Sequence, residues 1–503
     1  MTAFPEIMAR GGFDVVIGNP PYVRMEHLKP IKPYLEKHYK VASERSDLYC
    51  YFFELGVNLL RPGGRMGYIS SSTFFKTGSG EALRRFLLDE TTIETVIDFG
   101  DLQVFEGVTT YPAVITVRRA TAHDDARIRF LALTDTLPAN LAAEFLKRGQ
   151  TMPQARLCAG SWQLEGDALS ALRAKLSLGR KTLKEVYGSP LAGIKTGLNE
   201  AFVVDRATRD AIIRADAASS PLFKPFLEGK DLQRWRVESQ DLWIIYVPKN
   251  NVDINQYPAV RAHLETYRLA LEKRATKQAW FELQQAQAAY VPSFESRKAY
   301  FPEFALTSQF SLESEPFYCS NKCYFVAGAS HADVALLNSK CSWFFFLGLS
   351  TAIRNGWREQ RGEYVERLPI PAIDAHFHGV LAALGERCRL IAESRRDLIG
   401  TFGHEILRDL APGGLTLKLP GVLQNWPLLD FAAFRAAVKK HFKRDIPQAE
   451  RNDWEAKLMA GAKRVAELTA EIRAAEREID QIVYHLFDLT PDEVALIEAS
   501  VAQ

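Results

Sequence analysis

Two prolines and an aromatic residue directly follow a short apolar run near the start of the chain. The stretch reads GFDVVIGNPPYVR and places Asn19, Pro20, Pro21 and Tyr22 after the strand-like segment FDVVIG. Each proline fixes φ near about −65° and removes an N–H donor, so the turn presents its carbonyl oxygens rigidly. Asn19 adds a side-chain carbonyl and Tyr22 adds a flat ring. Acceptors beside a stacking ring suit a planar group with an NH2, such as an adenine edge or a carboxamide.

This arrangement could activate an aromatic amine, which is a poor nucleophile because its lone pair is delocalised into the ring. The Asn19 side-chain oxygen and the Pro20 carbonyl could hold both amine hydrogens and favour a tetrahedral nitrogen whose lone pair faces an electrophile. Stacking on an aromatic ring contributes roughly 1–3 kcal/mol, which offsets much of the few kcal/mol needed to flip a base out of a duplex. An ordinary surface turn is the alternative, but the tetrapeptide follows an apolar strand, which favours the functional interpretation.

The elements that must position this turn alternate between strand-like and helix-like patterns over the first 120 residues. Short links between them indicate an α/β fold with a mostly parallel sheet covered on both faces, a partial Rossmann-like sheet. Ligands of such open sheets bind at the carboxyl ends of the strands, where the turn lies. The expected elements are the strands FDVVIG, RMGYIS, IETVIDFG and PAVITVRRA and the helices DLYCYFFELGVNLL, which ends at RPGG (61–64), and GEALRRFLLDE.

The rest of the chain divides by character. Residues 121–185 contain Pro and Ala and are predicted to be a linker, whereas strand-like runs and aromatic clusters at 186–375 indicate a mixed α+β domain. Residues 376–503 are predicted to be helical, with apolar residues spaced three and four apart between Val465 and Leu486, as in helices that pack side by side. Thr490 is expected to cap a final helix.

The composition excludes some classes of protein but does not identify the function. Lys and Arg number 63 against 61 Asp and Glu, so the net charge does not indicate nucleic-acid binding, although a local cluster of cations could still bind DNA. The six cysteines are too sparse for a disulfide scaffold, and no metal site is predicted. The N-terminus does not resemble a secretory signal, and no apolar run is long enough for a membrane helix. A cytoplasmic protein is expected.

DVVIGNPPY resembles the catalytic motif of S-adenosylmethionine-dependent amino-methyltransferases, specifically the N6-adenine DNA methyltransferases. The similarity extends through SDLYCYFFELGVNLLRPGGRMGYISSSTFF and DFGDLQVFEGVTTYPAVITV, which resemble the large restriction–modification enzymes with a TaqI-type specificity domain. The resemblance implies that Asn19 and Pro20 hold the target amine, that Pro21 is the rigid spacer, and that Tyr22 stacks on the flipped base. Phe105 matches the aromatic residue that closes the other side of the adenine.

Patterns between 186 and 375 also resemble the target-recognition part of these enzymes, which implies double-stranded DNA as the partner. GIKTGLNEAFVVD, LFKPFLEGKDLQRWRV, LLNSKCSWFFF and RGEYVERLPIP recur there in that order. Cations near turns could reach phosphates, and arginines among aromatic residues suit a nucleic-acid groove. A solvated surface charge is the alternative for each of them. The candidate DNA-contacting residues are Lys195, Lys230, Arg234, Arg354, Arg358 and Arg361.

The resemblance also implies S-adenosylmethionine as cofactor, yet the Gly-rich turn that holds it precedes the Asn-Pro-Pro-Tyr turn in the family. Neither MARGGF nor TGSGEAL (77–83) is expected to replace that turn. We therefore expect the chain to be the carboxy-terminal part of a longer enzyme, either a truncated frame or a split subunit. Its partner would be an amino-terminal methyltransferase half or another restriction–modification subunit, and little methyl transfer is expected from the chain alone.

Three functions follow from these observations. Site-specific methylation of adenine N6 in DNA is the main prediction. A DNA-specificity module without catalysis is the distinct alternative. A methyltransferase for a protein glutamine or an RNA guanine amine is less favoured, because those compact proteins end soon after the catalytic half, whereas nearly 400 residues follow the turn here. No nuclease centre is recognisable, so DNA cleavage is not predicted.

Overall fold

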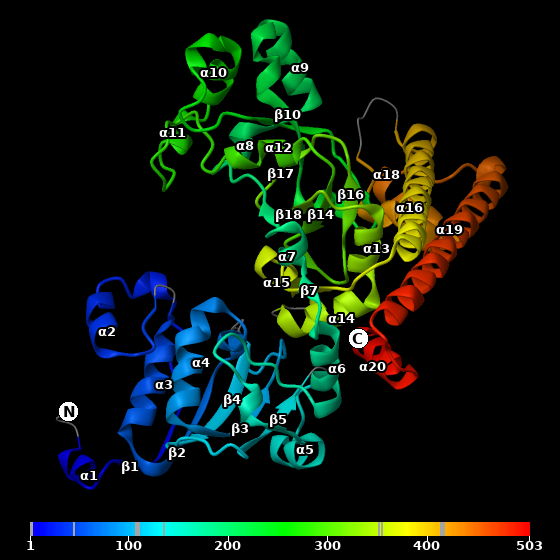
Figure 1. Cartoon of the computed structure of the whole chain (residues 1–503). Coiled ribbons are helices and arrows are strands. Elements are labelled where there is room, and N and C mark those ends of the chain that lie inside the picture. Colours follow the sequence, from blue (N-terminus) through cyan, green and yellow to red (C-terminus); the bar gives the residue numbers. More distant parts are fainter. Residues whose placement is uncertain are drawn as a thin grey trace. The chain divides into compact units, whose positions relative to one another are not determined.

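The computed structural model describes residues 4–43, 46–105, 111–133, 136–350, 353, 356–412 and 418–502. The chain folds into two compact units. The first comprises residues 1–179 and 345–359, and the second comprises residues 180–344 and 360–503. Figure 1 shows both units and labels many of their helices and strands.

The first unit is built on a six-stranded mixed sheet with the order β1-β2-β4-β3-β5-β6. Strands β1, β2, β3 and β5 run in one direction, and β4 and β6 run in the opposite direction. The carboxyl ends of the four like-directed strands therefore meet at one edge of the sheet. The strands are β1 (Phe13–Gly18), β2 (Leu60–Ser71), β3 (Thr92–Asp98), β4 (Pro112–Arg118), β5 (Arg127–Ala132) and β6 (Gln150–Pro153).

The main core of this unit lies on one face of the sheet, beneath helices α3 (Leu48–Leu59) and α4 (Glu81–Glu90) (Figure 1). Inward residues of the strands, such as Met66 and Ile115, pack there with the aromatic residues Phe53 and Phe74. Helix α3 is apolar around much of its surface, which its position between the sheet and neighbouring loops requires. Most of the hydrophobic packing of this unit is therefore on one face of its sheet.

The opposite face is covered only in part. Helix α5 (Leu141–Arg148) packs near β3 and β5 over a small apolar cluster that includes Ile97 and Leu131. At the β1 end, Val15 and Ile17 point to this same face and are 59% and 81% exposed. The prediction that helices cover both faces of the sheet is therefore wrong at the β1 end, as far as the described residues show.

Two further expectations differ from the structure. Residues 121–185 were expected to form a linker, but β5, β6 and α5 lie within them and extend the first sheet. Their strands are short and flanked by polar residues, so the periodicity is weak along the chain. A mostly parallel sheet was expected, but strand β4 runs antiparallel to both of its neighbours, β2 and β3.

The second unit contains two four-stranded sheets, β17-β10-β13-β9 and β16-β14-β18-β8. A large apolar cluster that includes Phe226, Phe294 and Tyr318 fills its interior. This mixed architecture confirms the predicted fold class of the region. The principal strands are β10 (Phe223–Leu227), β13 (Leu242–Ile245), β14 (Lys298–Pro302) and β18 (Cys323–Ala327).

Two long helices complete the second unit. Helices α16 (Ala375–Leu410) and α19 (Arg451–Leu486) lie side by side (Figure 1). The predicted apolar spacing is confirmed, because Leu468, Ile472 and Ile479 are buried along α19. Thr490 caps α20 (Pro491–Val501) through a capping box, as expected. Among the described helices, none combines the length and the apolar character that crossing a membrane demands.

Candidate active site

The Asn-Pro-Pro-Tyr turn lies where the sequence predicted, at the carboxyl end of β1. Gly18 ends that strand and pairs with Tyr68 of β2. A Cβ atom on Gly18 would lie 3.1 Å from the Tyr68 ring, so a glycine lets this ring pack directly under the start of the turn. Tyr68 is buried and packs edge-on against Phe53, which makes the floor of the turn rigid.

The chain after the turn is fastened to the amino terminus of α3. The backbone N–H of Leu48 donates to the Val23 carbonyl at 3.0 Å. The N–H of Met25 donates to Asp47 Oδ1 at 3.1 Å. Burial raises the pKa of Asp47, and the Met25 hydrogen bond lowers it. These bonds hold the turn between β1 and α3, so its backbone is fixed from both sides.

The four residues of the turn differ in exposure in a way that suits binding. Asn19 and Pro21 are exposed, whereas Pro20 is buried and Tyr22 is half-buried. The Tyr22 hydroxyl is buried without a hydrogen-bond partner among the described residues, and burial raises its pKa. An unpaired buried hydroxyl costs about 1–3 kcal/mol, a cost that often marks a functional position.

The structure does not bring Phe105 into ring contact with Tyr22. Phe105 follows β3 and is half-buried, and the sheet order places β2 and β4 between β1 and β3. Three inter-strand spacings amount to roughly 14 Å, which a closed aromatic clamp would have to bridge through its loops. The role of Phe105 stays a prediction, and the neighbouring residues 106–110 lie outside the described residues.

A cavity of about 170 Å³ opens at this same carboxyl edge of the sheet. Its wall includes Lys76, which follows β2, and Asp98, which ends β3. Arg358 completes the wall from a distant part of the sequence. Arg358 was predicted as a DNA contact, but Lys76 and Asp98 were missed. No local spacing joins the three residues, although Lys76 stands in the segment SSTFFKTGSG, directly after a strand.

The other predicted DNA contacts lie in the second unit, except Arg354, which lies outside the described residues. Lys195 is exposed, and Lys230 is exposed beside Glu228 at 2.6 Å. Arg361 lies 4.0 Å from Glu303. Their contact with phosphates stays a prediction.

Arg234 is held inside the second unit. Its guanidinium donates to Glu476 at 2.6 Å and to the carbonyls of Ser308 and Asn338 at 2.6 and 2.8 Å. These bonds join the strand region to helix α19. Arg234 therefore has a structural function in addition to the DNA contact that the sequence predicted.

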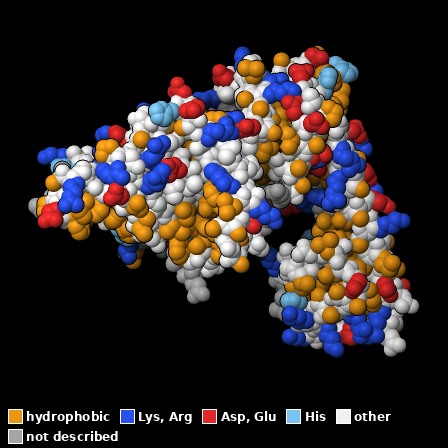
Figure 2. Space-filling model, turned by 90° about the horizontal axis from the view of Figure 1, so that it is seen from below, with side chains coloured by type: hydrophobic (Ala, Val, Ile, Leu, Met, Phe, Trp, Pro, Cys, Tyr) orange, Lys and Arg blue, Asp and Glu red, His pale blue; other side chains and the backbone are white. Residues whose placement is uncertain are grey.

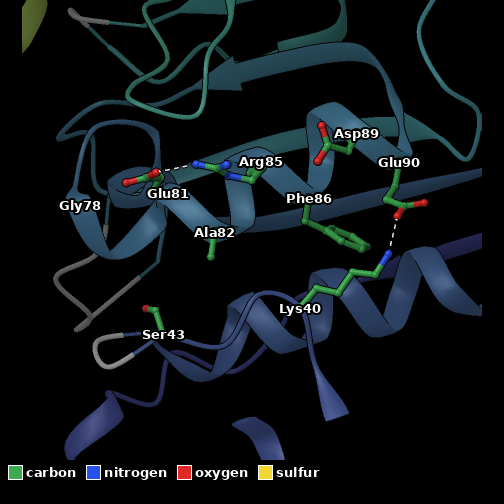
Figure 3. A pocket seen from close by; sticks show the side chains of 9 residues that line it. All are labelled: Lys40, Ser43, Gly78, Glu81, Ala82, Arg85, Phe86, Asp89 and Glu90. Carbon is green, nitrogen blue, oxygen red and sulfur yellow. Dashed lines mark hydrogen bonds and ion pairs between the residues drawn. The ribbon is translucent and has the colours of Figure 1, made fainter. Parts of the chain in front are cut away.

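The two glycine-rich turns give a test for the implied cofactor. A Cβ on Gly12 would lie 2.5 Å from the Leu59 carbonyl oxygen, so this turn is packed against the chain and is no open cradle. The turn at 78–80 borders a pocket beside α4, which Figure 3 shows. Both cations there are paired, Arg85 with Glu81 and Lys40 with Glu90. The described residues therefore do not fit the main cofactor loop.

Comparison with known families identifies three segments. Residues 1–105 match the Eco57I restriction-modification methylase family. Residues 224–370 match the TaqI-like C-terminal specificity domain. Residues 379–483, which include most of α16 and α19, match a domain of unknown function, DUF8810.

Curated relatives extend the similarity beyond these segments. The Type II methyltransferase M.PaeR7I of Pseudomonas aeruginosa is 28% identical over 381 residues, which are 72% of this chain and 65% of that protein. M.XhoI of Xanthomonas vasicola is 25% identical over 71% of this chain and 68% of that protein. The restriction enzyme and methyltransferase RM.Eco57I of Escherichia coli is 30% identical over 38% of this chain and 19% of that protein. The match thus spans about two thirds of the first two relatives.

A solved structure supports the same fold. The Type IIL restriction-modification enzyme MmeI, solved in complex with DNA, superposes with a TM-score of 0.55 at 12% identity and covers 97% of this chain and 57% of that one. With the family matches, this confirms the resemblance to the restriction–modification methyltransferases that carry a TaqI-like specificity domain.

Proposed function

We propose that this relative of the Type II restriction–modification methyltransferases takes part in methylating adenine N6 at a specific site in duplex DNA. S-adenosylmethionine is the proposed methyl donor, and a restriction–modification or related defence system is the proposed setting. The observation that carries the proposal is the exposed Asn19 on a turn fixed at the carboxyl edge of an α/β sheet. The TaqI-like segment at residues 224–370 supports DNA as the substrate.

In this proposal the turn recognises the amine rather than acting as a base. The Asn19 side-chain oxygen and the Pro20 carbonyl accept hydrogen bonds from the two amine hydrogens. Because both hydrogens are held, the nitrogen lone pair is directed out of the ring plane. Tyr22 stacks on the base, and Pro21 keeps the spacing between acceptor and ring. Phe105 is proposed to lie against the opposite face of the base.

The uncovered end of the sheet supports a further component. Ile17 lies beside Gly67 on an exposed face, and β1 has a free strand edge in the described unit. Exposed apolar edge strands promote association, and burying each large aliphatic side chain contributes about 1.5–3 kcal/mol. We infer that an α/β segment carrying the cofactor loop docks on β1, either from the same protein or from another subunit.

Analysis of methylated nucleosides tests the chemistry. The enzyme, complete with any segment it needs, is incubated with labelled S-adenosylmethionine and DNA, and the digested DNA is separated into nucleosides. N6-methyladenine is expected. Asn19→Ala should abolish transfer with little change in DNA affinity, whereas Asn58→Ala, at an exposed asparagine of α3 in the same unit, should retain it. Unchanged methylation by Asn19→Ala, or a product methylated elsewhere, would refute the assignment.

Calorimetry with S-adenosylmethionine tests the docking. The chain alone should give no binding heat, and binding should follow addition of a protein segment that carries the cofactor loop. Ile17→Asp should weaken that gain, whereas Leu55→Asp, at an exposed position of α3, should not. Robust cofactor binding by the chain alone would contradict the docked arrangement. DNA affinity without cofactor binding under either condition would favour the specificity module instead.

A further inference from the structure

The cavity at the carboxyl edge of the first sheet contains charges that the amine chemistry does not use. Two cations, Lys76 and Arg358, face it together with Asp98 and the hydroxyl-bearing residues Ser72, Thr73 and Tyr111. All six belong to the first unit. The cavity therefore combines positive charge with several hydrogen-bond donors inside a single folded body.

Lys76 is incompletely satisfied in its present surroundings. Its ammonium carries three N–H donors, yet in the described chain its one hydrogen-bond acceptor is the Ser350 carbonyl at 3.0 Å. No carboxylate oxygen of the described residues lies within 4.0 Å of Lys76 Nζ. The Lys76 ammonium is half-buried and has only a neutral hydrogen-bond partner among the described residues, so its desolvation is not offset by a negative charge. A bound anion would offset it.

The electrostatics agree with this geometry. Burial, together with the nearby positive charge of Arg358, lowers the pKa of Lys76 to about 8, against the opposing effect of Asp98. Burial also lowers the pKa of Arg358, while Asp101 and Asp98 raise it and Arg173 lowers it. Burial raises the pKa of Asp98, and the positive charges of Lys76 and Arg358 lower it. An anion placed between Lys76 and Arg358 would relieve their repulsion.

We propose that this cavity binds one phosphate group of the DNA strand whose base is presented to the Asn-Pro-Pro-Tyr turn. The ammonium of Lys76 and the guanidinium of Arg358 donate charge-assisted hydrogen bonds to the phosphate oxygens. The hydroxyl groups of Ser72, Thr73 and Tyr111 surround the remaining oxygens. This inference rests on the proposed DNA substrate and adds a phosphate site to it.

The position of the cavity favours DNA as the source of the phosphate. The turn at the end of β1 and the cavity at the ends of β2, β3 and β5 share one edge of the sheet. A strand lying along this edge could present a base to the turn and a backbone phosphate to the cavity. Phosphate contacts of this kind fix the register of DNA without reading its sequence.

Equilibrium binding with three probes tests the proposal. The probes are single-stranded hexadeoxyadenylate, the same oligonucleotide with an uncharged methylphosphonate backbone, and inorganic phosphate. Lys76→Met should weaken hexadeoxyadenylate binding about tenfold, the loss expected for a charge-assisted hydrogen bond. It should also reduce the slope of log affinity against log salt by about 0.7, which corresponds to one single-strand phosphate. The methylphosphonate probe should bind weakly and respond little to Lys76→Met.

The controls separate charge at this site from general effects. Lys40→Met removes a cation of the same unit outside the cavity and should leave binding unchanged. Lys76→Arg should retain most of the affinity, because it keeps a cationic donor. Equal losses for the charged and uncharged oligonucleotides, or wild-type binding by Lys76→Met, would overturn the proposal. Tight binding of inorganic phosphate with no discrimination between the two oligonucleotides would overturn DNA as the source.

A second measurement covers the case in which Lys76→Met does not fold. The lysines of the wild-type protein are 13C-dimethylated, and the Lys76 signal is followed by NMR as the pH is raised. Hexadeoxyadenylate should move its titration to higher pH, whereas the methylphosphonate probe should not. An unmoved titration would refute phosphate binding. Loss of N6-methyladenine formation with the Lys76 response intact would instead count against the proposed function alone.

Discussion

Arg84 offers the sharpest stability test of the platform that holds the candidate site. Its side chain is fully buried, and its guanidinium donates to backbone carbonyls on two separate segments. Within the 72–77 turn it reaches Phe74 and Thr77. In the 159–160 segment it reaches the Ala159 and Gly160 carbonyls at 2.6 and 2.8 Å. Arg84→Met keeps the aliphatic volume and removes all of these donors.

The magnitude follows from what the substitution leaves behind. Four carbonyls lose a charged donor, and the Phe74 carbonyl among them is buried. A hydrogen bond to a charged group contributes about 1.5–3 kcal/mol, so the loss of this set should cost about 3–5 kcal/mol. For a unit of this size, 1 kcal/mol corresponds to roughly 2–4 °C in melting temperature, so a decrease of about 10 °C is expected. The turn that loses these bonds carries Lys76, so the candidate phosphate site should loosen with it.

Differential scanning calorimetry and hydrogen exchange measure the effect. The transition of the first unit should shift down, and peptides covering 72–77 and 159–162 should lose protection. Arg85→Met is the matched control, because Arg85 is the next residue of α4, its side chain is 63% exposed, and it pairs with Glu81 one turn earlier. Such an exposed pair contributes about 0.3–0.5 kcal/mol. Equal melting temperatures for the two variants would refute the reasoning.

Three further predictions concern pH and backbone conformation. Lys76 is charged below its pKa of about 8 and neutral above it, so hexadeoxyadenylate affinity measured by titration should fall between pH 7 and 9 in the wild type and stay flat in Lys76→Met. Gly12→Ala should destabilise the protein by about 1–3 kcal/mol in denaturant unfolding, because φ is +119° and the added Cβ meets the Leu59 carbonyl. Gly63→Ala, with φ +79° and open space, should cost less, and the reverse order would contradict this account. Burial raises the pKa of Asp480 to about 6, so its charged form penalises folding above pH 6, and the penalty disappears as the pH falls toward 4. Asp480→Asn keeps an acceptor for the Lys340 N–H and should raise the melting temperature at pH 7.5 more than at pH 5; an equal gain at both values would exclude the titration as the cause.

Local signals carried much of the fold. Three features each depend on only a few neighbouring residues. They are the apolar run of β1, the helix that ends just before Pro62-Gly63 and the capping box at Thr490. The three-and-four spacing along α19 likewise identified its buried stripe. Such features depend on backbone geometry and side-chain period, which neighbouring residues largely decide.

Other elements depended on partners distant in sequence. The 121–185 segment has weak periodicity, and its strands β5 and β6 are recognisable only because they pair with the edge beyond β3. The roles of Lys and Arg residues were harder still to predict, because the same local sequence at a turn can leave a cation solvated, paired or buried. Arg234 forms bonds with Glu476, 242 positions away.

The sequence alone determined the turn itself: Asn19 to Tyr22 follow an apolar strand, and proline restricts the backbone wherever it occurs. The distribution of exposed apolar area and the cavity were decided only by the tertiary structure. Lys76, Asp98 and Arg358 meet there because strand order and the return of residues 345–359 to the first unit bring distant segments together. Electrostatic surroundings depend on such distances in space, which residue spacing along the chain does not contain.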